Sequence, residues 1–402
     1  MKSQRKKKAK KDNDKSERKM KAKNTKKAKD KERSERTKKA RAEYKKEEVK
    51  EKEGAVGTTG GGTTGSGSTT GSGGTGAIPD QEEEKEKARK IEENEKKKKE
   101  EPPPPVKEPW TGEDAAKRML ASGVFNSATF PAGFKELCTI KPTQDDCPRF
   151  KQNVEKVRAP DLPILDEKLV KLYHAPDGFI CAAKIAVPEF TRTMILTQVP
   201  DVTVPTNIED FWRMIFHEEV VSVVIALMPL ECSVTLQQLF PISNSTFANH
   251  GKMFVNNKKV ESSVGVTAYT LELLPEGCSN SFNTTVHHLH NWRQKRGLDS
   301  VGDLATLLDK VVKLNENTVF VSMKGAGRAG TMLSIFTAMV HINKDKDVKM
   351  KEIVDKLRLE RCGIVESAEQ FVTIHKVLAA WFKKKSQDEE IAKKVAEFSP
   401  GL

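Results

Sequence analysis

One segment, residues 318–331, constrains the fold of this chain more than any other. An apolar run leads into a glycine-rich turn, and a helical pattern begins directly after the turn. A strand that turns tightly into a helix directs backbone N–H groups inward at the helix N-terminus, which is an anion-binding geometry. Arg328 adds a planar, two-pronged donor suited to phosphate. The segment predicts a phosphate-binding loop; the alternative is a simple tight turn. The three glycines are Gly325, Gly327 and Gly330.

The positive charge of the chain is concentrated in its first 110 residues. They hold 34 Lys and Arg against 22 Asp and Glu, which is +12 of the total net charge of +13. Residues 1–53 are Lys-rich and carry no sustained apolar stripe, and residues 54–76 are almost only Gly, Thr and Ser. Such segments cannot bury enough apolar area to offset their ordering entropy. We therefore expect a disordered tail with a flexible linker, ended by the proline run at 102–105.

The remaining residues are nearly neutral and long enough for one substantial core. Between Ile164 and Val260, short runs rich in Val, Ile and Thr alternate with polar turns, which is typical of strands. After Leu298 helical patterns dominate. This order predicts a mixed α/β (α+β) domain at 111–385, with a sheet flanked by helices, followed by a C-terminal tail at 386–402. The expected strands are Thr193–Thr197, Val220–Leu227, Val264–Leu274 and Thr318–Ser322. The expected helices are Ala115–Val124, Glu209–Phe216, Leu304–Leu314, Gly330–Ile342, Val348–Arg361 and Ala368–Lys383.

Several blocks of the sequence resemble the tyrosine-specific protein tyrosine phosphatases. The loop is similar to that family's signature HCxxGxGR[ST]G, which its three glycines and Arg328 match. Across roughly residues 115–383, the order and spacing of further blocks agree with the family, most closely with its divergent nematode-type branch. The resemblance implies a twisted mixed sheet with helices on both sides. The further blocks are Thr197–Pro200, Ile208–Met214, Glu231 with Cys232 and Pro241, Val286–Ser300, and a last block with Arg358, Arg361, Gly363, Val365, Glu369 and Gln370.

Three residues depart from the family where the resemblance places catalytic roles. Ser322 stands at the nucleophilic cysteine, Gln294 at the general-acid aspartate, and Glu366 at the glutamine that positions water. A serine hydroxyl needs a base to become a nucleophile, and glutamine has no proton to give. Asp299 could replace the acid only after a loop rearrangement. We therefore predict a degenerate, inactive site. An active phosphatase is the alternative, and it needs a nucleophile other than Ser322.

The resemblance also implies which residues hold a phosphate-type ligand. Phe150 stands at the aromatic position of the family's phosphotyrosine-recognition loop and can stack on a ring. Gln152 replaces the aspartate that grips the peptide backbone. The loop amides and Arg328 do not depend on a thiol, so we expect that phosphate binding can survive. The predicted phosphate-binding residues are Ser322, Met323, Lys324, Gly325, Ala326, Gly327 and Arg328, and the supporting residues are Glu231, Phe150, Trp292 and Gln370.

Other features bound the cofactors and partners. The six cysteines form no CxxC pair or zinc-type Cys/His cluster, so we expect reduced thiols, no metal and no cofactor. No secretory signal and no run of about 18 apolar residues occurs, which favours an intracellular, cytoplasmic or nuclear protein. We expect a phosphotyrosine protein or another phospho-ligand as partner, and a monomer. Lys-rich runs such as Arg5–Lys11 could contact nucleic acid or anionic surfaces by charge, which would make the chain a scaffold, or simply solubilise the tail.

Overall fold

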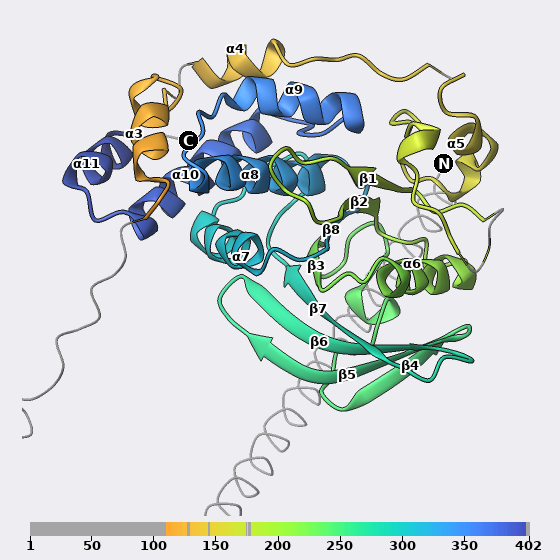
Figure 1. Ribbon diagram of the computed structural model, residues 1–402. Helices are drawn as coiled ribbons and strands as arrows, with labels where there is room; N and C mark the ends of the chain where they lie inside the picture. The colour runs from red at the N-terminus through yellow and green to blue at the C-terminus, as the bar shows by residue number, and fades with distance from the viewer. Residues whose placement is uncertain (1–109, 127–128, 144, 174, 176–177, 399–402) are drawn as a thin grey trace, which may run out of the picture. The chain divides into compact units, whose positions relative to one another are not determined.

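The computed structural model describes residues 110–126, 129–143, 145–173, 175 and 178–398 (Figure 1). The expected disordered tail, the linker and the proline break lie outside these residues.

An eight-stranded mixed sheet of order β1-β2-β8-β3-β7-β6-β5-β4 forms the centre of the domain. The middle of the sheet is parallel, because β8 lies between β2 and β3 and β3 pairs with β7 in the same direction. The outer strands pair antiparallel. Every residue of β2, β3 and β8 is buried, as expected for parallel strands covered on both faces. The strands are β1 (Ala182–Ile185), β2 (Met194–Gln198), β3 (Ser222–Ala226), β4 (Thr246–His250), β5 (Met253–Ser262), β6 (Val266–Pro275), β7 (Phe282–Leu289) and β8 (Thr318–Ser322).

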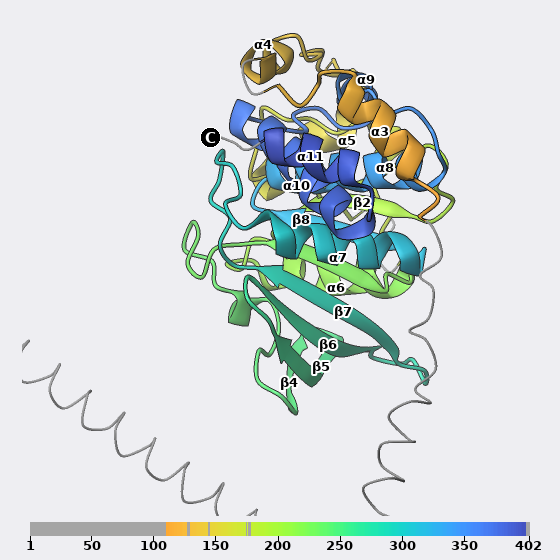
Figure 2. The same ribbon diagram turned by 90° about the vertical axis from the view of Figure 1, so that its left-hand side faces the viewer.

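Helices cover the two faces of the sheet (Figures 1 and 2). Side chains alternate along each strand, so Phe320 joins a core with α8 and α10, whereas Val319 and Val321 join the core formed with α6. The predicted mixed α/β fold is therefore confirmed. The α-helices are α3 (Glu113–Ala121), α4 (Phe130–Lys135), α5 (Pro148–Gln152), α6 (Pro205–His217), α7 (Val301–Leu314), α8 (Gly327–Asn343), α9 (Met350–Glu360), α10 (Ala368–Lys385) and α11 (Glu389–Glu397). Short 3-10 turns are η2 (Val154–Lys156), η3 (Asp166–Lys168) and η4 (Leu236–Gln238).

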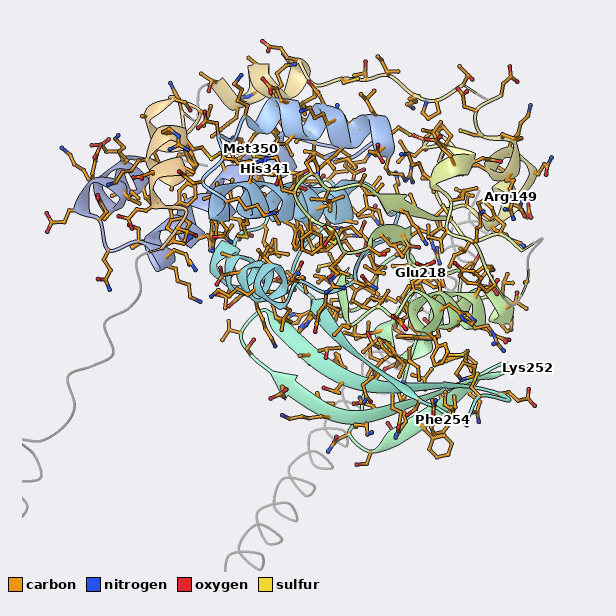
Figure 3. The ribbon with its side chains drawn as sticks, viewed as in Figure 1. Arg149, Glu218, Lys252, Phe254, His341 and Met350 are labelled. Carbon is orange, nitrogen blue, oxygen red and sulfur yellow. The ribbon has the colours of Figure 1, made fainter. Side chains whose placement is uncertain are left out.

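The antiparallel extension of the sheet has one face open to solvent. Phe254 on β5 lies on this extension, away from α8 and α9 (Figure 3). Its ring centroid is 5.4 Å from that of Phe247 on β4, whose side chain is 64% exposed. The extension therefore lacks the second helical layer that covers the middle of the sheet.

The segment expected as a C-terminal tail contains helix α11. The Asp388 carboxylate accepts hydrogen bonds from the N–H groups of Glu390 and Ile391, which caps the start of the helix. Ile391 is 1% exposed, and the Phe398 ring packs edge-on against Phe125 at a centroid distance of 5.0 Å. The helix thus belongs to the core that α10 and α3 share.

His375 on α10 is buried among aromatic rings, and it predicts a pH-dependent stability. Burial lowers the pKa of His375 to about 4, whereas the pKa of a histidine in the unfolded chain is about 6.5. As the pH falls between these values, the unfolded chain binds the proton first, so the free energy of unfolding decreases. The full decrease, reached below both pKa values, is roughly 3 kcal/mol. We expect His375→Leu to lose this part of the pH dependence in urea unfolding at pH 7 and pH 4.5. Identical pH dependence in both proteins would contradict the assignment.

Candidate functional site

The candidate phosphate loop connects the end of β8 to the start of α8, at the edge where the parallel strands end. Gln198 and Ala226, the last residues of the two neighbouring strands, lie level with Ser322. Open sheets with parallel strands bind ligands at this edge. Gly325 has a φ of +65°, and a Cβ on it would lie 2.5 Å from the Gln198 nitrogen. The loop therefore needs glycine here because its backbone turns against β2.

Several backbone N–H groups of the loop have no hydrogen-bond acceptor among the described residues. The N–H of Gly325 donates to the Ser322 carbonyl at 3.0 Å, and the N–H of Gly330 donates to the Ala326 carbonyl at 2.7 Å. Unpaired donors that converge at a helix N-terminus form an anion site. The N–H groups that have no acceptor in the described part of the chain are those of Met323, Lys324, Ala326, Gly327 and Arg328.

Arg328 is 2% exposed and is anchored by Glu231. Its Nη1 and Nη2 donate to the two carboxylate oxygens at 3.0 and 2.5 Å, and Nη1 also donates to the Trp292 carbonyl at 2.6 Å. These three bonds leave Nε–H and one N–H of Nη2, which lie on the same edge of the guanidinium, without an acceptor among the described residues. That edge can hold an oxyanion through two parallel hydrogen bonds.

Besides Arg328, two further residues donate hydrogen bonds to the Glu231 carboxylate. The Met228 N–H donates to it at 3.0 Å, and the Gln294 amide nitrogen donates to it at 2.5 Å. Burial opposes the ionisation of Glu231, but the hydrogen bonds and charge of Arg328 outweigh burial and lower the pKa of Glu231. The carboxylate therefore remains ionised at neutral pH and keeps Arg328 oriented.

Trp292 and Gln294 tie their loop to the phosphate loop. Trp292 is fully buried, and its ring nitrogen donates to the Arg296 carbonyl at 2.8 Å. The Gln294 amide nitrogen also lies 3.6 Å from the Cys232 sulfur. The structure thus brings the predicted residues Trp292, Gln294, Glu231 and Arg328 together in one connected network.

The Ser322 hydroxyl has no base beside it. Its Oγ accepts a hydrogen bond from the Ala329 N–H at 3.3 Å, and the residue is 2% exposed. Within the described part of the chain, no carboxylate or imidazole contacts this oxygen. Since a serine needs a base to act as a nucleophile, the contacts assign Ser322 a place in the loop structure.

Glu366 and Gln370 meet at the N-terminal end of α8. A Cβ on Gly327 would lie 2.1 Å from the nearer Glu366 carboxylate oxygen, so the carboxylate packs directly against the loop. The Gln370 amide oxygen accepts from the Glu366 N–H at 2.9 Å, and its amide nitrogen donates to the carboxylate at 3.4 Å. The Thr331 hydroxyl also lies 3.4 Å from the amide oxygen. Gln370 is fully buried, so these contacts occupy its amide.

Phe150 does not offer a stacking surface in this structure, which corrects the expected role of its ring. It is 3% exposed, and its ring centroid is 6.3 Å from that of Phe179 in an edge-on contact. The sequence block indicated an aromatic residue near the site, but the ring packs into the core instead.

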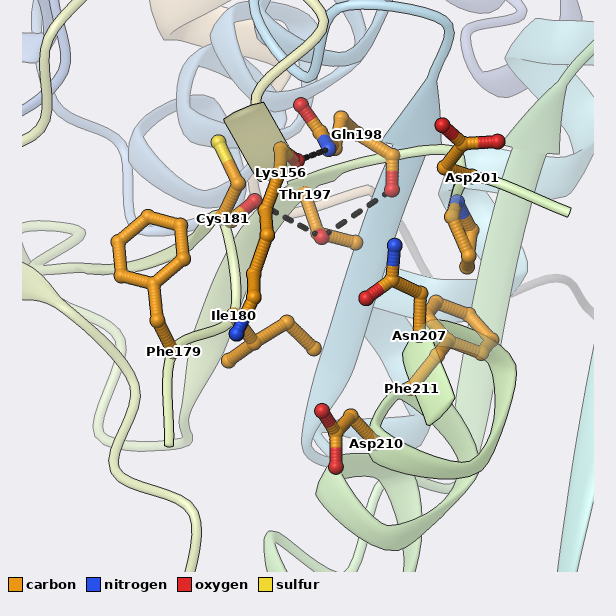
Figure 4. A pocket seen from close by; sticks show the side chains of 11 residues that line it. Lys156, Phe179, Ile180, Cys181, Thr197, Gln198, Asp201, Asn207, Asp210 and Phe211 are labelled. Carbon is orange, nitrogen blue, oxygen red and sulfur yellow. Dashed lines mark hydrogen bonds between the residues drawn. The ribbon is translucent and has the colours of Figure 1, made fainter. Parts of the chain in front are cut away.

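A small hollow lies beside Phe179 and the end of β2 (Figure 4). Its volume is about 20 Å³, which is room for little more than one water molecule. Thr197 and Gln198 line it from β2, and Phe211 lines it from α6. The hollow is therefore too small for a phosphotyrosine ring.

Sequence reasoning missed the role of Arg158, which carried no recognisable pattern. Its N–H donates to the Gln198 amide oxygen at 2.9 Å, and its guanidinium donates to the carbonyls of Val199 and Pro200 at 2.7 and 2.8 Å. The Gln198 amide nitrogen donates back to the Lys156 carbonyl at 2.7 Å. These bonds fix the segment after α5 to the strand that supports the phosphate loop.

Two further features can be stated for the residues that the structure describes. No cluster of three or more His, Cys, Asp or Glu side chains among them could hold a metal ion. No helix among them is long and apolar enough to cross a membrane.

Known proteins resemble this chain over most of the described domain. Residues 153–380 match the family model described as protein-tyrosine phosphatase. A Caenorhabditis elegans protein named "Putative tyrosine-protein phosphatase" is 57% identical over 294 residues, which is 73% of each chain. A second C. elegans protein with such a name is 25% identical over 67% of this chain and 64% of its own length. Rat tyrosine-protein phosphatase non-receptor type 2 is 28% identical over 62% of each chain. The chain spans less than two thirds of the length of the latter two.

Proposed function

The chain belongs to the protein-tyrosine phosphatase family, and on that premise we propose that it binds phosphate-type ligands such as phosphotyrosine without hydrolysing them. One observation carries the proposal. The free edge of Arg328 and the open amides of the loop are groups that hold phosphate, and none of them depends on a thiol. The groups that would break the phosphorus–oxygen bond are replaced.

Neither Ser322 nor Gln294 can replace the nucleophile and the acid of the family's reaction. A cysteine at a helix N-terminus can have its pKa lowered to roughly 3.5–7.5, which supplies a thiolate at neutral pH. Ser322 has only the Ala329 N–H as a partner among the described residues, and this donor does not remove a proton. Gln294 donates its amide to Glu231 and has no proton to give to a leaving phenolate. Loss of a general acid alone typically slows such a reaction by about 10²–10⁴-fold.

The charges at the loop favour the binding of phosphate. The neutral hydroxyl of Ser322 does not repel a phosphate as a thiolate would. The free edge of Arg328 supplies two parallel charged donors, and hydrogen bonds to charged groups contribute about 1.5–3 kcal/mol each. Because Glu231 already fixes the guanidinium, little side-chain entropy is lost on binding.

Calorimetric titration of phosphotyrosine at fixed ionic strength tests the proposal. Wild type should bind at a single site, and Arg328→Lys, which keeps the charge but loses the forked edge, should bind at least tenfold more weakly. The matched control is Arg213→Lys, on α6, where the guanidinium pairs with Glu209 at 2.8 Å. We expect this control to bind like wild type. Equal affinity of wild type and Arg328→Lys would place the ligand elsewhere and refute the proposal.

A further inference from the structure

We propose that Glu366 makes the phosphate loop select phosphate monoesters in their singly protonated form, so that binding takes up one proton from solution. This inference rests on the proposed function and adds the ionisation state of the ligand that the site accepts.

The position of the Glu366 carboxylate carries the inference. It lies where a side chain on Gly327 would begin, and Gly327 is the first residue of α8. The loop N–H groups without an acceptor belong to the residues that lead into this same helix start, and Arg328 is the second residue of the helix. A phosphate held by these donors therefore comes close to a second anion that belongs to the protein.

No cation neutralises Glu366 among the described residues. Among the described residues its side chain accepts one hydrogen bond, from the neutral amide of Gln370 at 3.4 Å. The charged side chains on neighbouring elements contact other groups. Arg328 pairs with Glu231, and Glu369 pairs with Arg296. Arg358 donates to the carbonyls of Ile364 and Val365, and Arg361 donates to those of Leu162 and Pro163. Lys324, on the loop itself, forms no salt bridge within the described part of the chain. A ligand would thus face an uncompensated carboxylate.

A phosphate monoester can carry either one or two negative charges near neutral pH. Its second proton is lost near pH 6, so phosphotyrosine is mainly a dianion at neutral pH. Two close anions repel strongly in a partly buried site, and such a pair favours the protonated form of one partner. A singly protonated phosphate can donate its O–H to Glu366 while its other oxygens accept from Arg328 and the amides. The dianion has no proton to donate, so it must first take one up.

The predicted result is a pH dependence that Glu366 controls. Calorimetry of phosphotyrosine between pH 6 and 8, in two buffers of different ionisation heat, should show proton uptake by wild type that rises from about half a proton at pH 6 toward one proton at pH 8. The dissociation constant should rise about tenfold per pH unit above pH about 6. Glu366→Gln keeps the shape of the side chain and its bond to Gln370, and it should lose this slope. At pH 8 the variant should bind phosphotyrosine at least tenfold more tightly than wild type.

Two controls separate the outcomes. Glu369→Gln removes a nearby carboxylate that faces Arg296, so the wild-type slope should remain. Tyrosine O-sulfate is a monoanion that takes up no proton, so its affinity for wild type should not vary over this pH range. Equal slopes for wild type and Glu366→Gln would overturn the inference while leaving the proposed function intact. Absence of phosphotyrosine binding by both proteins at every pH would instead refute the proposed function, and the inference with it.

Discussion

A variant that combines Ser322→Cys, Gln294→Asp and Glu366→Gln is expected to release phosphate from a phosphotyrosyl peptide, whereas wild type is expected to release none above the buffer rate. The physical reason is that the binding groups do not need to change. Arg328 and Glu231 are already paired, and the loop N–H groups that precede α8 are already without an acceptor among the described residues. Only the nucleophile, the acid and the residue next to Gly327 have to be replaced.

The gain should be strongly non-additive, because the three residues act in one reaction. Ser322→Cys alone supplies a nucleophile without an acid and should remain slow. Adding Gln294→Asp should raise the rate by about 10²–10⁴-fold. The Gln294 amide nitrogen lies 2.5 Å from Glu231, so a carboxyl at this position would be near a like charge, which raises its pKa and favours the protonated acid.

A matched control places the cysteine elsewhere on the same helix. Ser334 is fully buried on α8 and donates its hydroxyl to the Gly330 carbonyl at 2.8 Å. Ser334→Cys combined with the same two other substitutions should release no phosphate. Turnover by this control, or by wild type, would contradict the assignment of Ser322. A triple variant that binds phosphotyrosine without turnover would show that the loop geometry is altered along with its chemistry.

The second large effect concerns stability. Arg328→Ala is expected to destabilise the domain by about 3–5 kcal/mol, because it leaves the Glu231 carboxylate buried without its cation. The two side chains are only 1% and 8% exposed. Chemical unfolding monitored by tryptophan fluorescence measures the loss. The contrasting variant is Arg118→Ala, which breaks a salt bridge of 2.6 Å to Asp347 at the surface; it should lose far less stability, because solvent screens exposed pairs.

A double-mutant cycle identifies the cause of that loss. Glu231→Gln should cost less than Arg328→Ala, and the double variant should lose less than the sum of the two. Additive losses would mean that the two side chains stabilise the domain independently. That result would remove Glu231 as the residue that orients Arg328.

The sequence was most informative where local pattern and tertiary position agree. The apolar run at Thr318–Ser322 is β8, since a central parallel strand is apolar on both faces. Strand β7 was missed because its second half contains His287 and His288, which polarity-based patterns do not assign to a buried strand. Both are less than 9% exposed, and the His288 ring lies 2.7 Å from the Leu227 carbonyl. Tertiary pairing with β3 decides the conformation there.

The resemblance indicated which residues meet at the site, but not how their side chains are directed. It placed Glu366 near the loop, whereas its close contact with Gly327 depends on the turn before α10. It placed Phe150 at a recognition position, whereas the packing of α5 directs the ring toward Phe179. Such directions depend on contacts between distant segments, which no local pattern encodes.

The most direct test of phosphate binding without catalysis is a ³¹P NMR titration of phosphotyrosine with the wild-type protein. A single series of spectra reports binding through the ester resonance and hydrolysis through the inorganic phosphate resonance. We predict a saturable change of the ester resonance, with no inorganic phosphate after prolonged incubation. Growth of the inorganic phosphate signal in proportion to the protein, absent with Ser322→Ala, would contradict the proposal, as would an ester resonance that does not change.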